Sequence, residues 1–172
     1  MHKPVSMGIL SFMPSGRTHL RIELAALVPI AGAVSWLTTT AVVPAERGAA
    51  FLGGYLFSSL LLSPDLDLRA SRPMRRWGPL RVLWIPYAAA FRHRRLSHNP
   101  LWGPTTRLAY LGAWIALVSW LTAVALGRPL SVSWGGWPIM VAFLVGAYVP
   151  NEMHIIADWT GTAWKQRRSH RH

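Results

Sequence analysis

The sequence contains no cysteine, and this absence removes several kinds of site at once. Disulfides, thiolate zinc sites and cysteine nucleophiles are all excluded. Acidic residues are also scarce, because six Asp and Glu stand against eighteen Lys and Arg in 172 residues. In so basic a chain, two carboxylates close together suggest a specific role.

The net charge of +12 indicates a polyanionic partner, either nucleic acid or anionic lipid. The apolar content favours lipid, since 52% of the residues are hydrophobic, 14% are charged and ten are tryptophan. Nucleic-acid binding would explain the arginines but not the long apolar stretches. We therefore expect membrane lipids with anionic headgroups as partners, and no nucleic acid. The number of copies in an assembly does not follow from the sequence.

Four apolar stretches predict an all-α integral membrane protein. A bilayer core requires about 20 apolar residues per helix, and stretches this apolar leave no polar face for a soluble bundle. The second stretch is shorter, but Pro64 ends it sharply, and Gly53 and Gly54 would allow close helix packing. We therefore predict a four-helix membrane bundle. Its spans are Leu24–Val43, which Pro29 is expected to bend, Ala49–Leu62, Leu108–Leu126 and Trp137–Ala157.

The basic residues predict the orientation of these spans in the membrane. Arginines crowd the connection between the second and third stretches, and basic residues flank both outer ends of the set. The other two connections hold only Arg47 and Arg128. Because cytoplasmic segments carry the excess of Lys and Arg, both termini and the long middle connection are predicted to be cytoplasmic.

The organisation along the chain is one membrane domain over residues 14–164. Residues 1–13 are predicted to be an unstructured extension, and residues 165–172 a basic, His-rich tail. Within the middle connection, the segment from Arg76 to Arg92 mixes tryptophan, aliphatic and arginine residues. Such a segment is typical of the headgroup region, and Pro79 and Pro86 favour a loop with short helices over one continuous helix.

Seven side chains with metal-binding chemistry fall near the predicted cytoplasmic ends of the spans. Hydropathy and charge bias take no account of ligand chemistry, so scattered structural histidines would have no reason to gather on one side. A shared metal site is the simplest explanation. The candidates are His19, Asp65, Asp67, His93, His98, His154 and Asp158.

Each motif taken alone also has an ordinary explanation. Asp65 and Asp67 follow a helix end, where Asp is common as a cap, and the segment from His93 to His98 is equally a basic interfacial cluster. His154 and Asp158 are four residues apart and share a helix face. They could form a structural hydrogen bond, a ligand pair, or one ligand with a carboxylate that orients the imidazole.

The mixture of imidazole and carboxylate suits zinc, manganese or iron better than calcium. Four histidines and three aspartates exceed the shell of one tetrahedral zinc. The sequence therefore predicts one or two divalent ions, zinc first, with any surplus candidates acting as outer partners or as acid and base. Two neighbouring ions would suit phosphoester hydrolysis.

The order of these motifs resembles a bacterial family of uncharacterised membrane metal-binding proteins. That family is similar to the LexA-regulated, membrane-bound, metal-dependent hydrolases of the inner membrane. The resemblance extends from about Pro14 to Trp164. It implies that the seven candidates form the metal and active-site set. The motifs that carry it are Gly-Arg-Thr-His19, Asp65-Leu-Asp67, His93-Arg through Ser97-His98, and His154-Ile-Ile-Ala-Asp158.

The leading hypothesis is a metal-dependent hydrolase that cleaves a phosphoester of a lipid or other amphiphile at the inner leaflet. Asp65 or Asp158 would be the general base, and Arg92, Arg94 and Arg95 would hold an anionic headgroup. The alternative is a non-catalytic metal-binding membrane protein, such as a sensor, scaffold or metal-handling accessory. A transporter ranks last, because four spans are few for a monomeric carrier.

Overall fold

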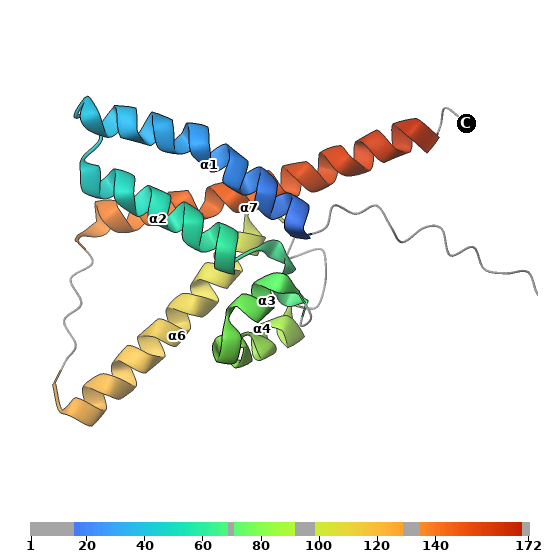
Figure 1. Ribbon diagram of the computed structural model, residues 1–172. Coiled ribbons are helices and arrows are strands. Elements are labelled where there is room, and N and C mark those ends of the chain that lie inside the picture. The colour runs from blue at the N-terminus through green and yellow to red at the C-terminus, as the bar shows by residue number, and fades with distance from the viewer. Residues whose placement is uncertain (1–15, 69–70, 92–98, 129–134, 170–172) are drawn as a thin grey trace, which may run out of the picture.

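The computed structural model is built from helices joined by turns (Figure 1). It describes residues 16–68, 71–91, 99–128 and 135–169, with the backbone alone at 16–17 and 161–169, and no strand occurs in these ranges. The all-α prediction is confirmed. In chain order the elements are α1 (Gly16–Thr39), α2 (Ala45–Leu61), η1 (Pro64–Asp67), α3 (Arg72–Arg76), η2 (Gly78–Leu83), α4 (Trp84–Ala90), α6 (Trp102–Leu126) and α7 (Trp137–Ser169).

Among the described helices, three rather than four are long and apolar enough to cross a membrane. They are α1, α6 and α7, through the windows Thr18–Thr39, Trp102–Leu126 and Trp137–Thr160. The expected fourth span, α2, has 17 residues, with Glu46 and Arg47 in its first turn. A helix of this length measures about 25 Å, short of a hydrocarbon core about 30 Å thick. The prediction of four spans was therefore wrong in number.

Both outer helices extend beyond the apolar stretches that predicted them. α1 begins at Gly16 instead of Leu24 and continues through Pro29, and α7 runs on to Ser169. Apolar windows miss polar helical turns, although these turns have the same backbone hydrogen bonds. His19 and Glu23 therefore lie on α1 itself, and α7 includes part of the segment expected to be a tail.

The α2 and α7 backbones approach each other closely along part of their length. A Cβ atom at Gly54 would lie 2.0 Å from the carbonyl oxygen of Phe143, and one at Gly146 would lie 2.0 Å from that of Phe51. Only glycine leaves room for this contact. The neighbouring Gly53 faces open space, so Gly54 alone of the predicted pair serves the packing.

α6 does not join the other long helices in a bundle. Figure 1 shows α1, α2 and α7 grouped together, whereas α6 starts near the end of α2 and diverges from them. Its contact with α7 lies near its start, where the Thr105 and Tyr148 hydroxyls are hydrogen bonded. Further along, Val118 and Trp120 are exposed. The expected four-helix bundle is therefore a three-helix group with a diverging fourth helix.

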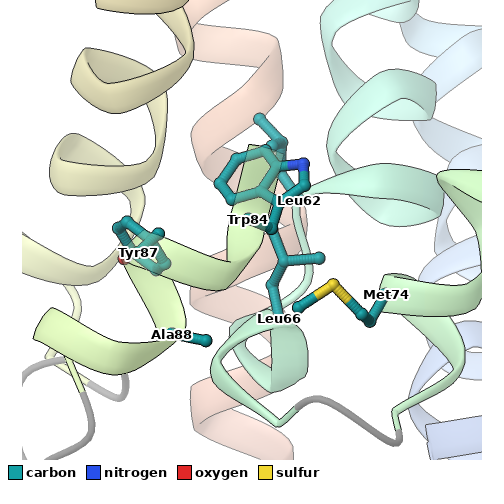
Figure 2. Close-up of a cluster of buried hydrophobic side chains, with 6 residues drawn as sticks. All are labelled: Leu62, Leu66, Met74, Trp84, Tyr87 and Ala88. Atoms are coloured by element: carbon teal, nitrogen blue, oxygen red, sulfur yellow. The ribbon is translucent and has the colours of Figure 1, made fainter. Parts of the chain in front are cut away.

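The connection between α2 and α6 forms a small core of its own (Figure 2). Its short helices agree with the prediction from Pro79 and Pro86, but Trp84 is 1% exposed and packs inside instead of lying at a lipid interface. Between Trp77 and Phe91, the exposed large hydrophobic side chains are Leu80, Val82 and Ile85. The buried set is Leu62, Leu66, Met74, Trp84, Tyr87 and Ala88.

A buried arginine ties this small core to the start of α6. Arg107 is 1% exposed, and its guanidinium donates hydrogen bonds to the carbonyl oxygens of Gly103, at 2.8 Å, and Leu62. The negative charges of Asp67 and Asp65 also act on it. Arg107 thus fixes the chain where α2 ends and η1 begins, whereas the sequence indicated only a contribution to the cytoplasmic charge excess.

Candidate metal centre

The site is formed by α1 and α7, the first and last described helices. His19 lies in the second turn of α1, and His154 and Asp158 lie one turn apart on α7. These three residues can each offer one ligand atom such that all three atoms lie within 4.8 Å of one another. His19 and His154 are buried, whereas the Asp158 side chain is 31% exposed. One carboxylate and two imidazoles therefore meet where the site reaches the surface.

The carboxylate of Asp158 faces both imidazoles. Its Oδ1 lies 3.1 Å from Nε2 of His19, and its Oδ2 lies 3.8 Å from Nε2 of His154. The two rings stack, with centroids 3.9 Å apart and planes inclined by 21°. Because each Nε2 faces the same carboxylate, the Nε2 atoms are the natural ligand atoms of both histidines.

Glu23 orients His154 through Nδ1, the ring nitrogen that does not face Asp158. Its Oε1 lies 3.3 Å from Nδ1 of His154, and its side chain is buried. A proton on Nδ1 donates to this carboxylate and leaves the Nε2 lone pair available, an arrangement common to histidine ligands of metals. The backbone oxygen of Glu23 also accepts a hydrogen bond of 2.7 Å from the Tyr55 hydroxyl, which fixes α1 against α2.

A polar pair about one turn from His154 fixes α7 against α2. The side-chain amide of Asn151 donates to the Ser58 hydroxyl at 2.7 Å and to the carbonyl of Ala147 at 2.9 Å. Both side chains are buried. Asn151 lies about one turn before His154, so this bond holds the ligand-bearing part of α7 at a set distance from α2.

The donor set fits a divalent transition metal. The ligand atoms of a tetrahedral zinc lie roughly 3.3 Å apart, given bonds of about 2.0–2.1 Å to nitrogen and oxygen. The nitrogen-to-oxygen distances of 3.1 and 3.8 Å bracket that value. Stacked rings direct their lone pairs side by side, so one ring must tilt further for both to bind one ion. Three protein ligands would leave the fourth position open.

Two further sequence candidates, Asp65 and Asp67, lie on η1, the turn that follows α2. Asp65 is half-buried on η1 and acts electrostatically on the His19 ring, together with Asp158 and Glu23. Asp67 is also half-buried, and its Oδ1 has no hydrogen-bond partner among the described residues; its charge acts on Arg107. η1 therefore brings one further carboxylate, that of Asp65, toward the α1 end of the site.

Five of the residues predicted from the sequence lie outside the described residues. These are the two central histidines, His93 and His98, and the three arginines expected to hold a headgroup, Arg92, Arg94 and Arg95. Their roles stay predictions. The geometry described above therefore concerns His19, His154 and Asp158, with Asp65 acting on His19 from η1.

Sequence reasoning missed the role of Glu23. His19 and Glu23 are spaced as on one face of a helix, but Glu23 precedes the predicted first span. Its partner, His154, lies 131 residues away in the sequence. A signal was present in the composition, since Glu23 is one of six acids and precedes an apolar run directly. The residues Ser59, Arg72 and Arg76, which line a pocket beside His19, carried no comparable signal.

Comparison with known protein families identifies the family to which the chain belongs. A family model described as "Uncharacterized metal-binding protein (DUF2227)" matches residues 14–168, so the chain belongs to this family. The matched region contains all seven candidate ligands. The family description agrees with the ligand chemistry at α1 and α7 and specifies no particular metal or reaction.

One relative of similar sequence is an "Uncharacterized protein" of Aquifex aeolicus (strain VF5). The two chains are 44% identical over 69 residues, which is 40% of this chain and 49% of the relative. The chain thus matches about half the length of this curated relative. No solved structure matches the chain.

Proposed function

We propose that this member of the metal-binding family is a membrane-embedded, metal-dependent hydrolase at the cytoplasmic leaflet, acting on a phosphoester of a lipid or other amphiphile. The observation that carries the proposal is the meeting of His19, His154 and Asp158 within 4.8 Å, with Asp158 partly exposed. Three protein ligands and an accessible edge suit a catalytic site, which needs an open coordination position.

The residues have separate roles in this proposal. His19, His154 and Asp158 hold a divalent ion, zinc first, with manganese or iron as alternatives. The bound ion would lower the pKa of a coordinated water and stabilise negative charge on a phosphoryl oxygen. Glu23 keeps His154 in the tautomer and orientation that ligation requires.

Asp65 is the better of the two candidate general bases. Both oxygens of Asp158 face imidazole nitrogens, which commits that side chain to ligation. Asp65 lies on η1, is half-buried and interacts electrostatically with His19. In this role Asp65 accepts the proton that the attacking water loses. Asp67, His93 and His98 remain candidates for a second ion.

The cytoplasmic leaflet is proposed from the distribution of basic residues. Cytoplasmic connections carry the excess of Lys and Arg, and the arginine-rich connection follows α2 at the end where η1 lies. Arg92, Arg94 and Arg95 would hold the anionic headgroup. A kinship with LexA-regulated hydrolases is part of this proposal; it is suggested by the motif resemblance and would imply the same class of reaction.

The burial of both imidazoles favours a second candidate, a non-catalytic metal site. His19 is 4% exposed and His154 is 2% exposed. A structural site is closed by a fourth protein ligand, whereas a catalytic site keeps a position for water. The same cluster would then stabilise a sensor, a scaffold or a metal-handling accessory.

Hydrolysis of phosphomonoester and phosphodiester amphiphiles by the purified full chain in detergent tests the proposal. Activity should disappear with a chelator, return with zinc or manganese, and be lost in Asp65→Asn while the bound metal is retained. Activity that resists chelation would refute it. Full metal content with no hydrolysis, and no exchange of solvent at a cobalt-substituted site, would favour the closed structural site instead.

A further inference from the structure

A small polar pocket adjoins the ligand cluster on its α2 and α3 side. It has a volume of about 10 Å³ and is formed where α1, the end of α2 and α3 meet. Apart from Leu20 and Pro73, every lining residue is polar or charged. These are His19, Glu23, Ser59, Ser63, Arg72 and Arg76.

Two lining residues carry buried polar atoms without hydrogen-bond partners among the described residues. These atoms are Nδ1 of His19 and Oγ of Ser59, whose side chains are 4% and 3% exposed. Buried polar groups in proteins are almost always hydrogen bonded, because an unpaired one keeps its full desolvation cost. Because both residues line one small polar pocket, a ligand or water in it could complete the hydrogen bonding of these atoms.

Metal ligation by His19, as proposed above, would specify what this ligand must offer. With Nε2 bound to the ion, the neutral ring would carry its proton on Nδ1. Nδ1 is then a donor and needs an acceptor. The hydroxyl of Ser59 can donate as well. The ligand therefore presents an oxygen that accepts at least two hydrogen bonds.

The charged residues of the pocket favour an anion. Arg72 and Arg76 lie one turn apart on α3 and are exposed, so their guanidinium groups can adjust to a ligand. Arg76 uses one donor on the carbonyl of Leu60, at 2.9 Å, and retains others. Glu23 is the only acidic lining residue, and its Oε1 is directed to His154.

We propose that this pocket is a phosphate subsite, in which one phosphate oxygen enters between His19 and Ser59 while Arg72 and Arg76 hold the outer oxygens. The volume supports this division, because about 10 Å³ accommodates a single oxygen-sized atom. Arginine binds phosphate through paired, charge-assisted hydrogen bonds. This inference rests on the proposed hydrolase and deepens it, since it assigns the substrate class to phosphate esters and names the residues that recognise them.

Binding of inorganic phosphate to the zinc-loaded full chain in detergent, measured by calorimetry, tests the subsite directly. Arg72→Gln, Arg76→Gln and Ser59→Ala should each weaken binding by about tenfold or more, the size expected for loss of a charge-assisted or buried hydrogen bond. Arg75→Gln is the matched control. Arg75 is exposed on the same helix and does not line the pocket, so binding should change by less than about twofold.

A second arm identifies the source of the phosphate. Nanodiscs that contain phosphatidate should bind more tightly than inorganic phosphate if a lipid headgroup is the ligand, and no more tightly if a soluble ester is. Phosphatidylcholine nanodiscs provide the baseline. Equal effects of Arg72→Gln and Arg75→Gln, or no binding of either probe, would overturn the subsite.

Failure of the subsite is distinguishable from failure of the proposed hydrolase. Phosphate binding that depends on Arg72 and Ser59, without any turnover, would leave the subsite intact and remove the hydrolase. Turnover that is unchanged in Arg72→Gln and Ser59→Ala would leave the hydrolase intact and remove the subsite. Zinc content is measured in every variant, because loss of the ion would weaken phosphate binding for another reason.

Discussion

Two pockets among the described residues differ in size and in chemistry, and the smaller one is associated with the site. The larger has a volume of about 490 Å³ and lies at the opposite ends of α1 and α2, beside the start of α7. Apolar side chains such as Val34, Phe51 and Val141 line it, with Arg47 as its only charged residue. The pocket beside His19 has about 10 Å³, and two of its lining residues carry buried polar atoms without a hydrogen-bond partner in the described part of the chain. Unsatisfied polar atoms, rather than volume, indicate chemistry here.

The close α2–α7 contact lies between these two regions, and the largest effect is expected there. Gly54→Ala would place a Cβ 2.0 Å from the carbonyl oxygen of Phe143, so the helices must separate. We expect a loss of about 3 kcal/mol in the free energy of unfolding, together with loss of bound metal. Unfolding in detergent, followed by circular dichroism, measures the first effect.

Gly53→Ala provides the matched control for that substitution. Nothing lies within 4 Å of a Cβ at this position, so the variant should be more stable by roughly 0.5 kcal/mol, because alanine loses less backbone entropy in a helix. Equal destabilisation by both substitutions would contradict the close contact.

Substitution of a ligand residue should lower metal binding, whereas a substitution at the other end of the molecule should not. His154→Ala deletes one of three ligands and should lower metal affinity by more than about 100-fold, beyond the roughly 10–100-fold cost of losing an outer partner. Elemental analysis of purified protein measures the bound ion. Val141→Ala, in the larger pocket, should leave metal content unchanged, and a similar loss in both variants would show that the ends are not independent.

A smaller loss of metal affinity is expected when Glu23, which contacts the ligand His154, is substituted. Glu23→Gln keeps the size of the side chain but removes the carboxylate that orients His154, and should weaken metal binding by about tenfold. Glu152→Gln is the control, because Glu152 lies on α7 and neither belongs to the cluster nor lines the small pocket. An equal change in the two variants would show a general charge effect instead.

The smallest effect distinguishes two neighbouring serines on α2. Ser58→Ala removes the acceptor for the Asn151 amide and should cost about 1 kcal/mol of stability. Ser59→Ala removes a hydroxyl that has no partner among the described residues, so stability should change by less than about 0.5 kcal/mol. Thermal unfolding of the two variants decides this, and a greater loss in Ser59→Ala would show a missed structural bond.

The sequence predicts the helices of this fold better than their arrangement. α1, α6 and α7 follow from long apolar runs, but α6 is apolar on every side and has no polar face to specify a neighbour. Its divergence from the other helices could not be read from the pattern. Trp84 shows the same limit, since an aromatic residue suits both a lipid interface and a buried core.

The candidate site shows a similar division between local and distant relations. The i,i+4 spacing predicts that His154 and Asp158 share a face, and likewise His19 and Glu23. The pairing of Glu23 with His154 links residues 131 positions apart. It depends on how α1 and α7 pack, and the local spacing of residues does not reveal that packing. The unpaired atoms of His19 and Ser59 also become visible only in three dimensions.

The positions of His19 on α1 and His154 on α7 have a consequence for biosynthesis. Translation produces α1 first and α7 last among the described helices, so a nascent chain holds one imidazole long before its counterparts exist. Tight capture of an ion by all three ligands must therefore await the synthesis and docking of α7. Metal loading would then report that α1 and α7 have come together, and chains truncated before α7 would remain unloaded.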